Sequence, residues 1–310
     1  MSWHLRPSRR GLALLLTAAG LGAAVGSCRT LGPRVLPAAP LASVQELVAA
    51  QVAAPVMRIG ILTGATRASV GADSGIVVRG TAAGGEAKDI KVMRATFAPL
   101  ADNKDQLRLI ETGDTLTAAT LFPGAPGEGL ALEATAYRGL IEVRADGEGG
   151  LTAINIVNLE DYLKGVVPNE LSPQAYPQIE ALKAQAVAAR TYALSNRGQY
   201  KLKGFDLCAT PACQVYRGRS SESPLSDQAV DETRGQSASY RGRLINALYT
   251  STCGGHTEDG SSIFEGEETP YLRGVACEPE RSAWATVKTL AKPLSFEGFS
   301  TLGRDAAVLA

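Results

Sequence analysis

The segment that decides the fold begins with YLKGVVPNE at residues 162–170 and continues with EALKAQAVAARTY at residues 180–192. Asn158 stands where its side chain can cap a short helix, and Pro168 breaks that helix. The second stretch predicts a longer helix from about residue 177 to residue 195, because residues suited to a narrow buried stripe recur there at helical spacing. The members of this stripe are apolar or small: Ile179, Leu182, Ala186, Ala189 and Ala193.

The chain on either side of these helices is typical of short strands separated by turns. After residue 204 we expect loops and short strands. The clearest strand is predicted at residues 244–252, where Ile245, Ala247 and Tyr249 alternate with Asn246, Leu248 and Thr250. The pattern predicts an α+β fold, with a β-rich N-terminal part at residues 56–150 and a core of helices and strands at residues 151–280. Strands are predicted at 57–62, 69–71, 76–79, 92–97, 107–110, 140–144 and 151–157, with loops at 81–87 and 122–128.

The first 27 residues have the layout of a secretory signal peptide. Arg6, Arg9 and Arg10 form a positively charged start, and the apolar run at residues 11–25 is shorter than the ~20 residues that a membrane-spanning helix needs. VGSC at residues 25–28 resembles a bacterial lipobox, in which the cysteine becomes the lipidated first residue.

These features predict an exported lipoprotein that Cys28 anchors to a membrane, in the periplasm or cell envelope. The alternatives are an ordinary signal peptide in which Cys28 plays no part and an uncleaved anchor helix, and all three interpretations place the remainder outside the cytoplasm. Residues 28–55 are rich in Pro, Ala and Leu and are predicted to form a tether. Residues 281–310 are a tail to which we assign no role.

The charge balance argues against nucleic acid as a partner. The chain has 31 basic and 31 acidic residues, and three basic ones lie in the predicted signal peptide, which leaves 28 basic residues against 31 acidic ones. Sequence-independent binding to nucleic acid requires a basic face. We therefore expect no nucleic-acid partner.

Four cysteines follow Cys28, and they leave two interpretations open. An even set in an oxidising compartment predicts disulfides among Cys208, Cys213, Cys253 and Cys277, although the sequence does not choose between the three pairings. Alternatively, Cys253 and His256 could bind zinc together with Cys208 and Cys213, since a structural zinc site takes four such ligands.

One acidic and two basic residues are candidates for a functional site. Glu170 lies between the two predicted helices beside apolar residues, where partial desolvation would favour its neutral, proton-donating form. Lys183 and Arg190 are seven residues apart. That separation is two helical turns, or roughly 10.5 Å, and puts both on nearly one face. Cations on one face can hold polar groups of a ligand, although a solvated basic face has the same pattern.

Five segments, taken together and in this order, resemble the family of stage II sporulation protein D and the amidase enhancer LytB. The resemblance covers about residues 56–280 and is most specific at residues 162–170 and 180–192. The three later segments are CATPACQVY at residues 208–216, STCGGHTE at residues 251–258 and PYLRGV at residues 270–275.

The resemblance implies a lytic transglycosylase that acts on peptidoglycan glycan strands stripped of their stem peptides. Glu170 matches the family's catalytic acid, which protonates the oxygen between N-acetylmuramic acid and N-acetylglucosamine. The muramic C6 hydroxyl then attacks C1 and forms a 1,6-anhydro end, so that one carboxylate acts first as acid and then as base. Lys183 and Arg190 match basic positions of a glycan-binding cleft that the α+β core would present.

The resemblance bears on the cofactor as well. The reaction requires none, but some members bind zinc near the cleft through Cys and His, and Cys253 and His256 could match those ligands. Relatives commonly have His before the second Cys of the loop at residues 208–213, where this chain has Ala212. This departure weakens the zinc interpretation and favours a disulfide between Cys208 and Cys213.

The LytB name implies an alternative function of a different class. The chain would then be a non-catalytic, peptidoglycan-binding modulator of an N-acetylmuramoyl-L-alanine amidase. Under either function the partners are peptidoglycan glycan strands and, through the lipid anchor, a membrane, and a cell-wall amidase joins them under the second.

Overall fold

The computed structural model describes residues 55–82, 84–250, 253, 255–264 and 269–276. All of them belong to the larger of the chain's two compact units, which spans residues 41–310. The predicted signal peptide with Cys28, the predicted tether up to residue 54, Cys277 and the predicted tail lie outside the described residues. Within the described residues, no helix combines the length and the apolar character that crossing a membrane requires.

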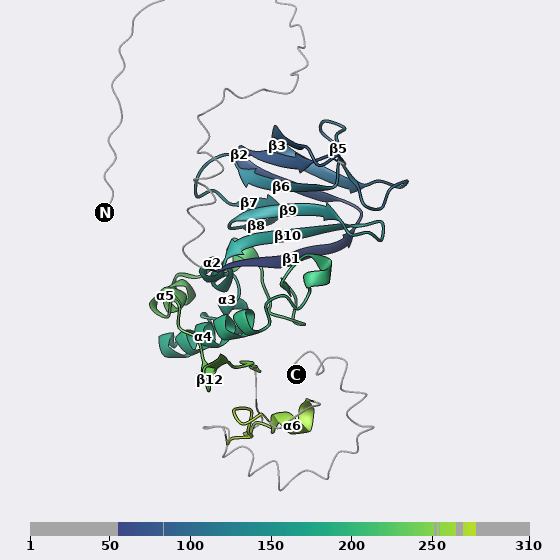
Figure 1. The fold of residues 1–310 in the computed structure, drawn as a ribbon. Coiled ribbons are helices and arrows are strands. Elements are labelled where there is room, and N and C mark those ends of the chain that lie inside the picture. Colours follow the sequence, from purple (N-terminus) through teal and green to yellow (C-terminus); the bar gives the residue numbers. More distant parts are fainter. Residues whose placement is uncertain (1–54, 83, 251–252, 254, 265–268, 277–310) are drawn as a thin grey trace, which may run out of the picture. The chain divides into compact units, whose positions relative to one another are not determined.

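One sheet of eleven strands forms the β-rich part of the chain (Figure 1). The strands are β1 (Val56–Ala65), β2 (Ala68–Thr81), β3 (Ala87–Pro99), β4 (Leu107–Leu109), β5 (Thr115–Leu116), β6 (Ala118–Pro123), β7 (Leu130–Leu132), β8 (Thr135–Tyr137), β9 (Leu140–Ala145), β10 (Leu151–Asn158) and β11 (Leu207–Cys208). Their order is β11-β1-β10-β9-β6-β2-β3-β4-β5, while β7 pairs with β2 and β8 pairs with β7. Neighbours are antiparallel except for β1 and β11, which run parallel.

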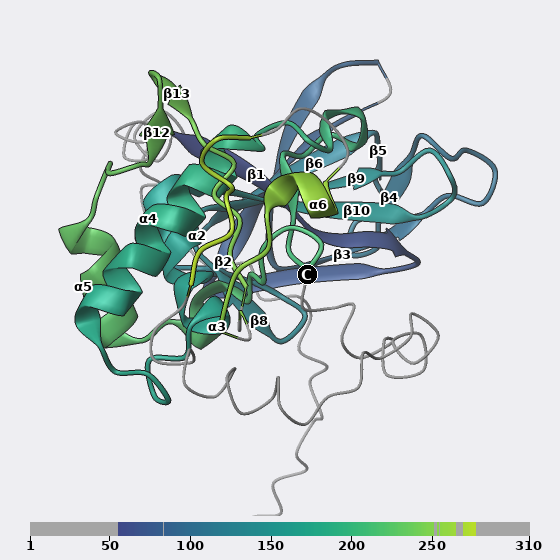
Figure 2. The same cartoon turned by 90° about the horizontal axis from the view of Figure 1, so that it is seen from below.

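The helices follow the first ten strands in the sequence and pack beside the sheet. They are α2 (Leu159–Lys164), α3 (Val167–Glu170), α4 (Ile179–Ser195), α5 (Pro224–Glu232) and α6 (Gly260–Ile263), with 3-10 turns η1 (Lys201–Lys203) and η2 (Gly218–Ser221) and a hairpin of β12 (Ser239–Tyr240) and β13 (Arg243–Leu244). Helix α2 contacts β1, β10, α4 and α5. Helices α4 and α5 pack side by side (Figure 2).

Strand β10 joins the sheet to the helices. Its apolar sequence is nearly continuous because β1 and β9 flank it and almost every position is buried. Asn155 is a fully buried polar residue of this strand, and its side-chain hydrogen bonds are satisfied. Its amide donates to the carbonyl oxygens of Arg138 and Leu140, and its Oδ1 accepts the Tyr216 hydroxyl at 2.8 Å. This buried contact ties the middle of the sheet to the chain that follows the helices.

The predicted α+β, β-rich fold is confirmed, and so is the buried stripe of α4. Leu182, Ala186, Ala189 and Ala193 are fully buried, and Ile179 packs against the same core. The predicted cap is also present, because the side chain of Asn158 accepts the backbone N–H of Glu160.

Pro168, however, does not end the first helix. Helix α2 ends at Lys164 with Gly165 as its C-cap, and Pro168 instead lies in the first turn of α3. A proline is tolerated there because the first N–H groups of a helix have no partner within the helix.

Three other predictions were wrong. The strand predicted at residues 244–252 is strand only at Leu244, and residues 245–250 have no pairing strand, so alternation there reflects a loop with buried and exposed sides. Residues 122–123 belong to β6 rather than to a loop. Helix α5 was missed in a region expected to hold only loops and short strands, although Ser223 and Pro224 are typical of a helix start.

The sheet also crosses the boundary predicted at residue 150. Strand β1 pairs along its length with β10, and its other edge pairs with β11. The two predicted parts therefore share one hydrogen-bonded sheet.

Candidate functional site

Glu170 is the last residue of α3, a single helical turn between α2 and the loop that leads to α4. Val166 and Val167 are fully buried and anchor the start of this turn in the core. Gly165 approaches Tyr216 so closely that a Cβ atom there would lie 2.5 Å from Cε2 of the ring. The glycine therefore allows the junction of α2 and α3 to pack against Tyr216, and this packing fixes the position of α3.

The carboxyl group of Glu170 is half-buried, and its two oxygens have different surroundings. The backbone N–H of Val215 donates a 2.7 Å hydrogen bond to Oε1, whereas Oε2 has no hydrogen-bond partner among the described residues. Burial raises the pKa of Glu170 above the usual carboxyl value, and the Val215 N–H opposes that rise. The protonated acid therefore persists to higher pH than in a solvated glutamate. Its proton belongs on Oε2, because Oε1 already accepts the N–H.

Three tyrosines lie near enough to this carboxyl group for its charge to act on them. Burial is the main cause that raises the pKa of Tyr162, Tyr192 and Tyr249, and the negative charge of Glu170 raises it further. Gln214 links two of these rings, because its Oε1 accepts the Tyr162 hydroxyl at 3.1 Å and its Nε2 donates to the Tyr249 hydroxyl at 3.0 Å. The phenols stay neutral, so the groups near Glu170 are aromatic rings and uncharged polar side chains.

Arg190 does not line an open cleft, and that prediction was wrong. Its side chain is 1% exposed, and its guanidinium donates to both carboxylate oxygens of Glu160, at 3.0 and 2.6 Å. Further bonds go to the carbonyl oxygens of Ala186, Val230 and Gln236. The side chain therefore joins α2, α4 and α5 from the inside, where no glycan can reach it.

Lys183 lies on the same side of α4 but nearer its start, where it remains partly exposed. Its Nζ contacts Glu180 Oε1 at 2.8 Å and Glu232 Oε2 at 2.7 Å, so it ties α4 to the end of α5. The seven-residue spacing did put Lys183 and Arg190 on one helical face. That face packs against α5, a contact that spacing within one helix does not reveal.

The cysteines among the described residues are disulfide-bonded. Cys208 and Cys213 form one, with their Cα atoms 5.5 Å apart, which is the pairing that the resemblance favours. Cys253 is also disulfide-bonded, so it has no thiolate to offer a metal. His256 is exposed, and its Nδ1 lies 2.6 Å from the carbonyl oxygen of Thr257.

The zinc alternative at Cys253 and His256 therefore finds no support in this part of the chain. Among the described residues, no three His, Cys, Asp or Glu side chains gather as a metal site would require.

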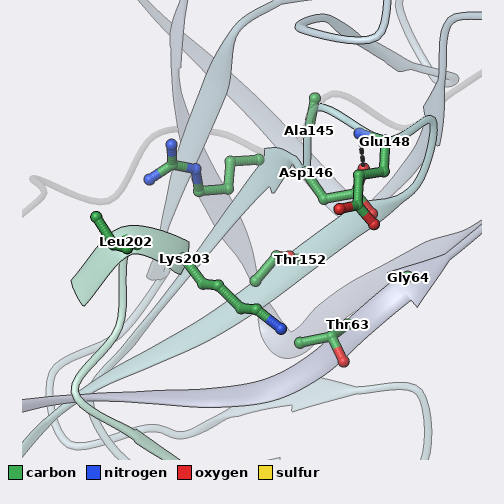
Figure 3. A pocket seen from close by; sticks show the side chains of 9 residues that line it. Thr63, Gly64, Ala145, Asp146, Glu148, Thr152, Leu202 and Lys203 are labelled. Atoms are coloured by element: carbon green, nitrogen blue, oxygen red, sulfur yellow. Dashed lines mark hydrogen bonds between the residues drawn. The ribbon is translucent and has the colours of Figure 1, made fainter. Parts of the chain in front are cut away.

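A pocket of about 380 Å³ lies elsewhere, between the end of β1, the turn from β9 to β10, and η1 (Figure 3). Its charged residues have both signs, and Lys203 extends across it toward Thr63. Glu170 is not among the lining residues, so the predicted glycan-binding cleft is not this pocket. The lining is Thr63, Gly64, Arg144, Ala145, Asp146, Glu148, Thr152, Leu202 and Lys203.

Sequence reasoning missed three residues that contact or surround Glu170. Gln214 and Val215 belong to CATPACQVY, a motif that carried the family resemblance without a role for these two positions. Tyr249 lay in the segment mistaken for a strand. The sequence did offer an indication for Gln214, because a polar residue directly after a cysteine loop can be a buried hydrogen-bond partner. Nothing in the neighbouring sequence showed which residues it would bind.

Comparisons with known proteins show what part of this chain is similar to. Residues 147–240 match the family model described as SpoIID, stage II sporulation protein. An uncharacterized protein of Brachyspira hyodysenteriae is 46% identical over 139 residues, which are 43% of this chain and 37% of that protein. The amidase enhancer of Bacillus subtilis is 43% identical over 110 residues, 36% of this chain and 14% of the relative.

Stage II sporulation protein D of Bacillus subtilis is 34% identical over 138 residues, 40% of this chain and 39% of the relative. The matched part of the chain thus spans less than two fifths of the length of each of these three relatives. The family resemblance predicted from the five sequence segments is confirmed.

Proposed function

Because residues 147–240 match the SpoIID family model, we propose that this chain is a peptidoglycan lytic transglycosylase with Glu170 as its acid and base. The substrate would be glycan strands without stem peptides, and the scissile bond would join C1 of N-acetylmuramic acid to O4 of N-acetylglucosamine. The state of the Glu170 carboxyl group is the observation that carries the proposal.

That state suits proton donation. Burial raises the pKa of Glu170, and the Val215 N–H holds Oε1 in place, so the proton sits on the unengaged Oε2. A general acid is most effective when its pKa lies near the working pH, and a solvated glutamate falls well below neutrality. The raised pKa and the half-buried position therefore both favour Glu170 as a proton donor.

The proposed reaction balances with one carboxyl group. Oε2 gives its proton to O4 of the glucosamine unit as the C1–O4 bond breaks. The resulting carboxylate takes the proton of the muramic C6 hydroxyl, whose oxygen bonds to C1 and closes the 1,6-anhydro ring. Hydrolases with two carboxylates use the second one for water or for a covalent intermediate. Here the nucleophile belongs to the substrate, so no second carboxylate is needed.

Lys183 stays in this proposal as a substrate contact, with a changed role. Its charge already meets Glu180 and Glu232, so a sugar carboxylate would have to replace one of these partners. The exposure of Lys183 makes such an exchange feasible. We further place the site outside the cytoplasm, held to a membrane through Cys28.

The alternative function has one observation in its favour. The relative named amidase enhancer matches 110 residues of this chain at 43% identity. Under this alternative the domain would bind glycan and stimulate a cell-wall amidase without cutting the strand itself.

The test uses purified protein and glycan strands from which an amidase has removed the peptides. We expect 1,6-anhydro products from the wild type and a drop of about 10²- to 10⁴-fold in rate for Glu170→Gln, the usual contribution of a general acid. Glu86→Gln is the matched control, because Glu86 is exposed in the turn between β2 and β3.

Wild-type protein that pellets with sacculi and stimulates an amidase, yet releases no anhydro product, would establish the alternative. Equal rates for the wild type and Glu170→Gln would remove Glu170 from the mechanism.

A further inference from the structure

The segment at residues 208–216 connects the edge of the sheet to the carboxyl group of Glu170. It begins on β11, where Cys208 pairs with Gly60 of β1, and the N–H of Ala209 donates to the Gly60 carbonyl oxygen at 3.2 Å. It ends at Val215, whose N–H binds Glu170 Oε1. The position of that N–H therefore depends on how firmly the chain between Ala209 and Val215 is held.

The disulfide between Cys208 and Cys213 holds this chain at its centre. It closes a turn in which the N–H of Cys213 donates to the Thr210 carbonyl oxygen at 2.9 Å. The N–H of Tyr216 then donates to the carbonyl oxygen of Ala209 at 3.1 Å, across the base of the turn. Cys208 thus pairs with β1 directly, and Cys213 lies two residues before Val215, whose N–H binds Glu170.

Gln214, between Cys213 and Val215, is fully buried and bonded on every side. Its Nε2 donates to the Ala189 carbonyl oxygen and the Tyr249 hydroxyl, and its Oε1 accepts the Tyr162 hydroxyl. The disulfide therefore links the residue that pairs with β1 to the segment of Gln214 and Val215, and Val215 in turn binds Glu170.

We propose that the Cys208–Cys213 disulfide is a positioning and redox-sensitive element of the Glu170 site, which is fully formed only when the bridge is closed. The inference rests on the proposed function for its catalytic consequence, but its structural content is independent of that function. Both cysteines are half-buried and the three residues between Ala209 and Cys213 are exposed, so a reductant can reach the bridge.

The redox step is a thiol–disulfide exchange. A dithiol reductant gives two electrons and two protons to the bridge, the S–S bond becomes two thiols, and the reductant becomes a disulfide. In the reverse direction an oxidised dithiol protein closes the bridge after export. A chain still in a reducing compartment would then lack a fully positioned acid.

The first test measures hydrogen exchange of the Val215 amide and needs no substrate. In Cys208→Ser/Cys213→Ser we expect this amide to exchange at least ten times faster than in the oxidised wild type, because its carboxylate acceptor is no longer held opposite it. Amides of β10, such as those of Ala153 and Val157, should keep their protection and show that the sheet remains folded.

Unchanged exchange at Val215 would overturn the inference. If the double variant does not fold, oxidised and dithiothreitol-reduced wild type are compared in the same way. Cys253→Ser, compared with and without dithiothreitol, shows whether any effect of the reductant passes through the disulfide of Cys253 instead.

A second measurement separates positioning from general loosening. The Val215 N–H lowers the pKa of Glu170, so its loss should raise that pKa in the double variant, as followed by carbon NMR of the carboxyl group. In the double variant, the rate of glycan cleavage should begin to fall at a higher pH than in the wild type. The decrease in kcat should exceed the increase in KM.

An unshifted pKa together with an unshifted pH profile would leave the bridge a purely structural feature. Wild-type protein that cuts no glycan, yet shows the expected exchange and titration, would refute the proposed function and uphold the positioning role.

Discussion

At the scale of one residue, the surroundings of Glu170 change the acidity of an ordinary carboxyl group. Its carboxyl group is half-buried, one oxygen is bound by the Val215 N–H, and the other has no hydrogen-bond partner among the described residues. Burial raises the pKa and the N–H bond restrains the rise. The same arrangement has a consequence for stability that can be measured without substrate.

Replacing Glu170 by Gln should not destabilise the protein at neutral pH, and we expect its Tm to equal or exceed that of the wild type. The folded-state pKa of Glu170 is raised, so its contribution to stability is present below the unfolded pKa, about 4.3, and is lost as the pH rises through the folded value. Gln keeps an acceptor for the Val215 N–H and does not titrate.

Thermal unfolding between pH 4 and pH 8 checks this prediction. The difference between Glu170→Gln and wild type should grow with pH and close at the acid end, with Glu86→Gln unchanged throughout. A lower Tm for Glu170→Gln at pH 7 would show that the ionised carboxylate stabilises the fold.

Arg190 was predicted from the sequence to contact a ligand, but in the structure it forms a buried ion pair. It is almost completely buried and pairs through two nitrogens with Glu160, whose side chain is buried as well. We expect Arg190→Met to destabilise the protein by about 3–5 kcal/mol, because it leaves the Glu160 carboxylate buried without its charged partner and with only the Gly235 N–H as a donor.

Urea unfolding measures this loss, and the double variant Arg190→Met/Glu160→Met should recover most of it. A loss in Arg190→Met below about 1 kcal/mol, the value of an exposed ion pair, would argue that water reaches Glu160.

At the scale of elements, the short helix α3 takes its position from what lies on either side of it. Its own turn has only four residues and no side-chain cap, so its intrinsic stability is small. Buried valines hold its start, and Gly165 brings the α2–α3 junction against Tyr216 and the carbonyl oxygen of Gly218. A single methyl group at residue 165 tests this packing.

Gly165→Ala should displace α3, because the added Cβ would meet the Tyr216 ring at 2.5 Å and the Gly218 carbonyl oxygen at 3.0 Å. Overpacking of this kind destabilises by about 1–3 kcal/mol. We expect that loss in chemical unfolding, together with reduced glycan cleavage. Gly84→Ala is the matched control, since a Cβ there meets no atom within 4 Å. Equal stability of the two variants would mean that Tyr216 can move aside.

At the scale of the whole described chain, the β-rich part and the helical part are one folding unit. Strand β10 lies between β9, which precedes residue 150, and β1 at the start of the described chain. Leu151, Ala153, Ile154 and Val157 are fully buried along this strand. The family match begins at residue 147, so it excludes β1.

We therefore expect a fragment that starts at residue 151 to remain unfolded, whereas a chain that starts at residue 41 folds as the full sequence does. The fragment would expose both edges of β10 and its apolar side chains, and unpaired buried strands do not fold alone. Circular dichroism during heating checks this. A cooperative transition of the fragment at the temperature of the longer chain would contradict the shared sheet.

The sequence by itself determined the features that depend on neighbours along the chain. The 3.6-residue stripe identified the buried face of α4, Asn158 marked the start of α2, and the spacing of short apolar runs indicated a β-rich fold. The ordered motifs predicted the resemblance to the SpoIID family and singled out Glu170 between two helical segments. Each of these signals lies within a few residues of the structure that it predicts.

Only the tertiary structure decided which partners those residues meet. Glu160 lies 30 residues from Arg190, and Val215 lies 45 residues from Glu170. Helical spacing tells which face a side chain shares, but not whether another helix covers that face. Helix α5 covers Arg190, which therefore forms a buried ion pair and cannot contact a ligand. The backbone N–H of Val215, from a distant loop, binds one oxygen of the Glu170 carboxyl group and opposes the rise of its pKa.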